Sequence, residues 1–85
     1  MDQEELRNVL KSNRAVIGAT LTLKRLKLGE IEKVIVTKNC PQQIKRDLRA
    51  HCADAEFVEL PQTNQQLGII CKKPYAISVL SVTRA

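Results

Sequence analysis

Cysteine and histidine are the residue types in this sequence that could supply a nucleophile and its general base. Cys40 directly precedes Pro41, which suits the first turn of a helix, and a helix N terminus lowers the pKa of a nearby thiol. The lone histidine, His51, falls near the far end of the same predicted helix, roughly 15 Å away at 1.5 Å per residue. Because a general base must lie within hydrogen-bonding reach of its nucleophile, we expect Cys40 to pack in a loop or core instead.

No other group of side chains matches a known pattern for catalysis, a metal or a cofactor. The three cysteines are an odd number without a Cys-x-x-Cys pair, and the carboxylates are scattered. Neither the glycine-rich phosphate loop nor the dinucleotide motif occurs. We therefore expect no enzymatic activity, no catalytic residue, no metal, no cofactor and no small-molecule substrate.

Basic residues are the feature that most clearly indicates a partner. Fourteen Lys and Arg against nine Asp and Glu leave a net charge of +5, which favours a polyanion. Between positions 7 and 28 there is no acid at all, but six basic residues: Arg7, Lys11, Arg14, Lys24, Arg25 and Lys27. Three of these follow a glycine turn on one predicted helix, where free backbone amides add to the attraction for phosphate. The alternative is a solvated helix face.

A second basic cluster surrounds the lone tyrosine. Lys72 and Lys73 precede Tyr75 with one proline between, and no acid follows Glu59. An aromatic ring beside lysines suits stacking on an unpaired RNA base. The alternative is that Tyr75 begins the last strand with its ring half buried.

The spacing of apolar residues predicts four helices alternating with four strands. The predicted helices cover residues 2–11, 19 or 20 to 29, 41–55 and 63–70, and the strands cover 15–17, 34–36, 57–58 (an edge strand) and 76–82. Leu21 and Leu28 fall away from the Leu23 and Leu26 face of the second helix, so either that helix is deeply covered or Leu21 meets a partner.

This alternation predicts the α/β class: a three-layer α/β/α sandwich with a four-stranded mixed sheet. A chain of 85 residues suffices for a single domain, 1–85, and not for two independent cores. No run of some 18 apolar residues and no charged-then-apolar leader occur, so we expect a cytoplasmic protein without a membrane partner.

Three stretches in order and at their proper separation resemble one known family. They are Gly-Ala-Thr-Leu-Thr-Leu-Lys at 18–24, Val-Ile-Val-Thr-Lys-Asn-Cys-Pro at 34–41, and Gln-Leu-Gly at 66–68 with Lys-Pro-Tyr at 73–75 before an apolar strand. Together they are similar to the archaeal and eukaryotic large-subunit ribosomal protein L-thirty-e family, within the L-seven-Ae-type kink-turn-binding superfamily. The resemblance implies the same sandwich fold and a structural, rRNA-binding role in the large subunit of the cytoplasmic ribosome, with neighbouring ribosomal proteins as further partners.

Members of this family bind a kink-turn, an internal RNA loop with sheared G·A pairs and an extruded base. By position, the resemblance implies that the turn and first helical residues approach the G·A pairs: Gly18, Ala19, Thr20 and Leu21. Lys24 lies behind them toward phosphate. Thr20 and Leu21 stand where the family usually has longer polar residues, and a leucine cannot hydrogen-bond a base edge. We therefore expect binding to depend more on phosphate contacts, stacking and shape.

The resemblance places the rest of the interface in two later segments. Asn39 lies in a loop that contacts RNA, and Tyr75 takes the place of an aromatic that packs on a base. Ile77 is expected on the same face of the last strand as Tyr75 by alternation, and Lys73 is expected to reach the RNA backbone. Lys72 replaces a common glycine, which adds charge and makes a left-handed turn harder to form.

Two other functions stay open from the sequence. One is a kink-turn-binding protein of a non-ribosomal ribonucleoprotein, which Leu21 disfavours because that group relies on a polar residue there. The other is a protein-interaction module on the same fold, which the basic stretch from Arg7 to Leu28 disfavours.

Overall fold

Helices and strands alternate in the computed structural model, which describes residues 3–52 and 54–84. The elements in chain order are α1 (Gln3–Lys11), β1 (Ala15–Ile17), α2 (Ala19–Lys27), β2 (Ile31–Val36), α3 (Gln42–His51), β3 (Glu56–Glu59), α4 (Asn64–Ile70) and β4 (Val79–Thr83). Each predicted helix and strand is present among these residues, while Asp2 and Ala53, which the predicted helices included, lie outside them. None of the described helices has the length and apolar character needed to cross a bilayer.

The four strands form one mixed sheet in the order β1-β4-β2-β3. Strand β4 runs antiparallel to both of its neighbours, β1 and β2, while β3 runs parallel to β2. Strands β1, β2 and β3 therefore all end at the same edge of the sheet, and β4 begins there. The segments that follow β1, β2 and β3 and the segment that precedes β4 all leave the sheet at that edge, so segments far apart in sequence meet there.

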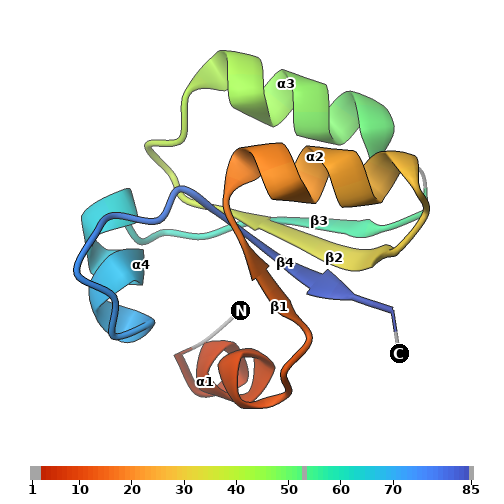
Figure 1. The fold of residues 1–85 in the computed structure, drawn as a ribbon. Coiled ribbons are helices and arrows are strands. Elements are labelled where there is room, and N and C mark those ends of the chain that lie inside the picture. The colour runs from red at the N-terminus through yellow and green to blue at the C-terminus, as the bar shows by residue number, and fades with distance from the viewer. Residues whose placement is uncertain (1–2, 53, 85) are drawn as a thin grey trace.

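Helices cover both faces of the sheet, as the predicted α/β/α sandwich requires (Figure 1). Val34 and Val36 of β2 face α2 and α3, whereas Ile35 between them faces α1 and α4, following the alternation of a strand. The core on the first face centres on Leu26 and Leu48, both buried helix residues. The three-layer fold class is thus confirmed.

Three element boundaries differ from the predicted ones by three residues or more. Strand β2 begins at Ile31, since a register shift between Ile31 and Lys33 lets the strand continue through its charged stretch beside β4. Helix α3 ends at His51, and Ala55 lies beyond it in a turn whose amide bonds back to the Cys52 carbonyl (2.7 Å). Strand β4 begins at Val79, not residue 76.

Several local signals predicted the element ends correctly. Thr63 accepts a hydrogen bond from the Gln66 amide while the Gln66 side chain accepts from the Thr63 amide, which completes the capping box at α4. Gly29 adopts φ +73° after α2, a conformation that glycine takes without steric cost. Strand β3 lies at the sheet edge, as its short charged pattern indicated.

Candidate nucleic-acid interface

The predicted RNA-binding segments converge at the sheet edge where β1 and β2 end and β4 begins. The Gly18 amide donates to the Val79 carbonyl (3.0 Å), and the Thr37 amide donates to the Ser78 carbonyl (3.0 Å). Figure 1 shows the start of α2, the loop before α3 and the segment before β4 gathered at one end of the sheet. We name this region the strand-end surface, comprising residues 18–21, 24, 38–39 and 72–75.

Gly18 sets the direction in which α2 leaves the sheet. Its backbone lies at φ +111° and ψ 146°, a region essentially restricted to glycine, and the Thr22 amide makes the first helical bond to its carbonyl (3.1 Å). The backbone amides of residues 19–21, which lie between Gly18 and Thr22, have no acceptor within the helix. Thr20 and Leu21 are exposed there, with Leu21 50% exposed. The sequence allowed either a deeply covered α2 or a partner that contacts Leu21. The exposure of Leu21 excludes a helix that is covered at this residue.

Asn39 ties the loop before α3 to the start of α4. Its side-chain amide donates to Asn64 Oδ1 (2.8 Å), and its Oδ1 accepts from the Asn64 backbone amide (2.9 Å) and from the Thr37 hydroxyl (3.1 Å). Asparagine carries two amide hydrogens, so one remains for another acceptor. Asn39 therefore positions its own loop and keeps one donor at the exposed surface.

Gly68 allows the segment that carries Tyr75 to pack against α4. A Cβ atom at residue 68 would lie 2.3 Å from the Tyr75 carbonyl oxygen, so only glycine permits this approach. The Lys73 amide also donates to the Gly68 carbonyl (3.0 Å). Tyr75 is 54% exposed and stands outside β4, so the alternative in which it begins the last strand is wrong.

Lys72 adopts the left-handed backbone conformation that its position implied, with φ 58°. This conformation is unfavourable for a residue with a Cβ atom. The turn is held by the Lys72 amide, which donates to the Ile69 carbonyl (3.0 Å). The side chain of Lys72 is exposed, as are those of Lys73 and Lys24.

Ile77 is the one predicted site residue that the structure removes from the surface. It precedes β4, where its amide donates to the Asn64 carbonyl (3.0 Å) instead of entering the strand ladder. Its side chain is 2% exposed and packs with Leu67 and Leu80 in the core. The prediction that it shares a strand face with Tyr75 is wrong because period-two alternation does not apply outside a strand.

The lysines of the strand-end surface form no ion pair with another described residue. The ion pairs among residues 3–52 and 54–84 involve Arg14, Arg25, Lys33, Lys45 and Arg84. None of them involves Lys24, Lys38, Lys72 or Lys73, which leaves these ammonium groups available to an anionic partner. The sequence analysis did not predict Lys38 as a site residue. Lys38 is exposed and directly precedes Asn39 in the 34–41 stretch.

Cys40 lies just before α3, and His51 is the last residue of that helix. It is 4% exposed, and burial raises the pKa of its thiol, opposite to the lowering expected from the helix start. His51 lies at the end of α3 with its Nδ1 2.8 Å from the Asp47 carbonyl oxygen. Within residues 3–52 and 54–84, no three His, Cys, Asp or Glu side chains gather where a metal ion could be held.

Comparisons with known proteins identify the family. Residues 3–85 match the model of the "Ribosomal protein L7Ae/L30e/S12e/Gadd45 family". "Large ribosomal subunit protein eL30" of Archaeoglobus fulgidus is 32% identical over 78 residues, which cover 92% of this chain and 88% of that protein. The eL30 protein of Methanopyrus kandleri is 33% identical over 82 residues, which cover 94% of this chain and 75% of the relative.

A solved structure supports the same assignment of the fold. The "Giardia lamblia 15.5kD RNA binding protein" superposes with a TM-score of 0.77 at 21% identity, covering 98% of this chain and 71% of that one. At this level of identity, the likeness shows the fold alone. The resemblance predicted from the sequence motifs is confirmed, and the chain belongs to the ribosomal protein L7Ae/L30e/S12e/Gadd45 family.

Proposed function

We propose that this chain is a non-catalytic RNA-binding protein of the large ribosomal subunit that binds rRNA at a kink-turn-like internal loop through the strand-end surface. The observation that carries the proposal is that three sequence segments meet at one edge of the sheet. These segments carry four exposed lysines that form no ion pair with another described residue. The similarity to eL30 proteins over nearly the whole chain supports a ribosomal role.

The proposed recognition divides between two kinds of contact. The amides at the start of α2 and the ammonium groups of Lys24, Lys38 and Lys73 bind phosphates, and the exposed ring of Tyr75 stacks on an unpaired base. Leu21 presents an apolar side chain where a polar one would read a base edge, so shape and stacking contribute most of the discrimination.

The hydrogen bonds of Asn39 support this proposal because they hold the loop before α3 in place. Because the side chain of Asn39 already bonds to Asn64, the loop before α3 does not have to be ordered when RNA binds. Lys45 adds to this support, since its Nζ donates to the Lys38 carbonyl (3.2 Å). A preorganised loop avoids part of the entropy cost of association.

A titration against a short kink-turn RNA tests the proposal directly. The control RNA has its sheared G·A pairs replaced by Watson–Crick pairs, and both are measured at two salt concentrations. Tighter binding to the kinked RNA is the expected result. Equal and strongly salt-dependent binding to both would contradict kink-turn recognition, and no binding to either would contradict an RNA-binding role.

Variants then assign the contacts. Tyr75→Ala is expected to weaken binding by roughly 1 to 3 kcal/mol if the ring stacks on a base. Lys73→Ala is expected to reduce the slope of log affinity against log salt by about 0.9 per lost phosphate contact, treating the RNA like duplex DNA. Lys27→Ala is the matched control, because Lys27 is an exposed lysine in the last turn of α2 and outside the strand-end surface.

A further inference from the structure

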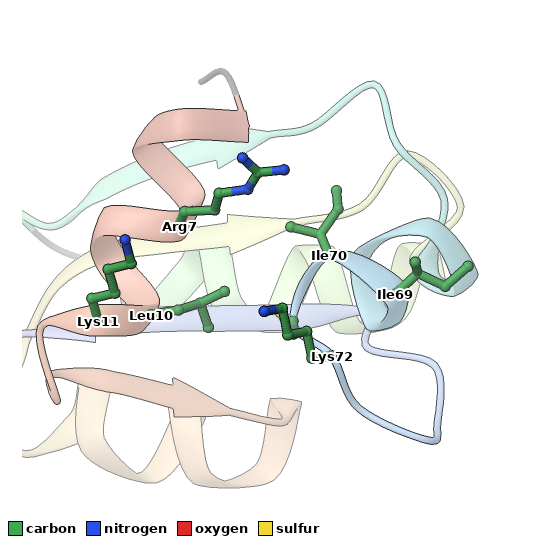
Figure 2. Close-up of a pocket in the computed structure, with 7 residues that line it drawn as sticks. Arg7, Leu10, Lys11, Ile69, Ile70 and Lys72 are labelled. Atoms are coloured by element: carbon green, nitrogen blue, oxygen red, sulfur yellow. The ribbon is translucent and has the colours of Figure 1, made fainter.

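A second surface, separate from the start of α2 and the Asn39 loop, lies between α1 and α4. The two helices leave a groove of about 630 Å³ (Figure 2). Leu10 of α1 and Ile70 of α4 contribute aliphatic side chains to it, and Cys71 completes this apolar part. Both aliphatic side chains are only partly buried, although they pack against the core.

Ile69 extends the apolar character of the groove out to solvent. It is 75% exposed, the highest value among the large hydrophobic side chains of residues 4–52 and 54–84 that are exposed. A lone exposed isoleucine requires no explanation, but this one adjoins a groove that already has an aliphatic lining. Figure 2 shows the side chain of Ile69 on α4 directed away from α1, on the far side of Ile70.

The rim of the groove is positively charged. Arg7 and Lys11 of α1 and Lys72 after α4 line it, and all three side chains are exposed. The ion pairs found among residues 3–52 and 54–84 do not include any of these three cations. No carboxylate of these residues lines the groove either. An occupant that complements this surface therefore carries negative charge around an apolar centre.

The lining discriminates between classes of partner. RNA would neutralise the cations but leave the aliphatic side chains uncovered, because the described residues that line the groove offer no aromatic ring for stacking. A small ligand would lie largely in solvent, since the cations and Ile69 at the rim are exposed, whereas small-molecule sites enclose most of their ligand. A peptide segment can cover an open groove with apolar anchors and set acids against the rim.

We propose that the α1–α4 groove docks a segment of a partner protein that presents an aliphatic anchor flanked by aspartate or glutamate. The aliphatic anchor contacts Leu10, Ile69 and Ile70, and the acids face Arg7, Lys11 and Lys72. This site goes beyond the proposed RNA-binding role and does not depend on it, because only Lys72 belongs to both surfaces.

A peptide selection tests the chemistry of the occupant. A display library of random peptides, each about four helical turns or less in length, is selected against the full chain, and the enriched peptides are titrated into ¹⁵N-labelled protein. We expect enrichment of peptides with aliphatic residues beside acids, with chemical-shift changes on α1 and α4. Failure to select peptides, a consensus without acids or without aliphatic residues, or shifts confined to other elements would overturn the proposal.

Charge-reversal variants test the rim. Arg7→Glu/Lys11→Glu is expected to weaken peptide binding by at least about 10-fold. The matched control, Lys27→Glu/Arg46→Glu, changes the net charge equally at exposed positions outside the groove and is expected to bind peptide within about 2-fold of the parent. If the double variant does not fold, Ile69→Ser tests the apolar part of the groove with a single change at an exposed residue.

RNA binding by the same variants separates the two surfaces. Both double variants are expected to lose the same kink-turn RNA affinity, since they differ only in where the charge was changed. A greater loss for Arg7→Glu/Lys11→Glu than for its control would assign the groove to RNA and overturn the peptide proposal. That result would leave the proposed function itself intact.

Discussion

Replacing Gly68 by alanine tests how the fold presents Tyr75. The new Cβ atom would lie 2.3 Å from the Tyr75 carbonyl oxygen and 3.3 Å from the Ala76 Cα. Since Cβ contacts under 3.0 Å are essentially absent from real structures, the backbone of the 72–76 segment has to move away from α4. The change therefore acts on the position of the tyrosine without altering its side chain.

The expected loss of stability combines two opposing effects. Overpacking a close contact costs about 1 to 3 kcal/mol. Alanine is better than glycine inside a helix by roughly 0.5 to 1 kcal/mol, which offsets part of this cost. We expect the free energy of unfolding to fall by about 1 kcal/mol, measured by urea denaturation. The variant remains folded at room temperature because small domains have stabilities of about 5 to 15 kcal/mol.

The loss of RNA affinity is expected to come from the displaced tyrosine ring and not from the small loss of stability. If the displaced ring can no longer stack, binding to the kink-turn RNA weakens by up to the full stacking contribution of about 1 to 3 kcal/mol. Fluorescence anisotropy with a labelled kink-turn RNA measures this as a loss of roughly 5- to 150-fold.

Gly29→Ala is the matched control for Gly68→Ala. Gly29 has φ +73°, and no neighbouring atom lies within 4 Å of the place that a Cβ atom would take, so alanine there costs backbone energy without a clash. The residue lies beyond the end of α2, opposite Gly18, and we expect lower stability with unchanged RNA affinity. Equal losses of RNA affinity in both variants, or an unchanged Gly68→Ala protein, would refute the reasoning.

Three further predictions concern other contacts of the site. Asn39→Ala is expected to lower the unfolding free energy by about 1 to 2 kcal/mol and to speed hydrogen exchange of the Asn64 amide, which NMR can follow; an unchanged exchange rate would contradict the contact. Lys72→Gly is expected to raise the unfolding free energy by roughly 0.5 to 1 kcal/mol in urea denaturation by relieving the left-handed backbone, whereas Lys72→Ala gives no increase. The hydrogen bond from Lys45 lowers the pKa of the Glu59 carboxyl, so this contribution to stability is present above the unfolded-state pKa and is lost as the pH falls through the folded-state pKa. In a carboxyl NMR titration, Lys45→Met is expected to return the pKa of Glu59 toward its ordinary value. The same Glu59 pKa in the variant and the parent would show that the Lys45–Glu59 pair has no effect.

Much of the fold was predictable because its signals are local. The capping box from Thr63 to Gln66, the glycine after α2 and the apolar spacing of each helix all act within about one turn. The position of each element could therefore be predicted without knowledge of its neighbours. The starts of β2 and β4 were predicted less accurately because hydrogen bonds to other segments decide them, as the Ile77 amide shows.

The candidate site was predicted from charge and from resemblance, and the segments that carry its residues meet at one edge of the sheet. Ile77 was misplaced because the assumption of strand alternation extended past the point where β4 begins. Lys38 was missed because a single lysine beside a motif carries little signal in a chain with fourteen basic residues. The groove between α1 and α4 could not be predicted, since it depends on how two helices distant in sequence pack on one face of the sheet.

By itself, the sequence determined the elements, the basic character and the family resemblance, because periodicity, capping and composition are properties of neighbouring residues. Only the tertiary structure decided the strand order, and with it the edge at which residue 18 meets residue 79 and residue 37 meets residue 78. It also explains why residue 68 is a glycine, because a side chain there would clash with the backbone of Tyr75. These contacts join segments separated by many residues, and sheet pairing and helix packing create them only when the chain has folded.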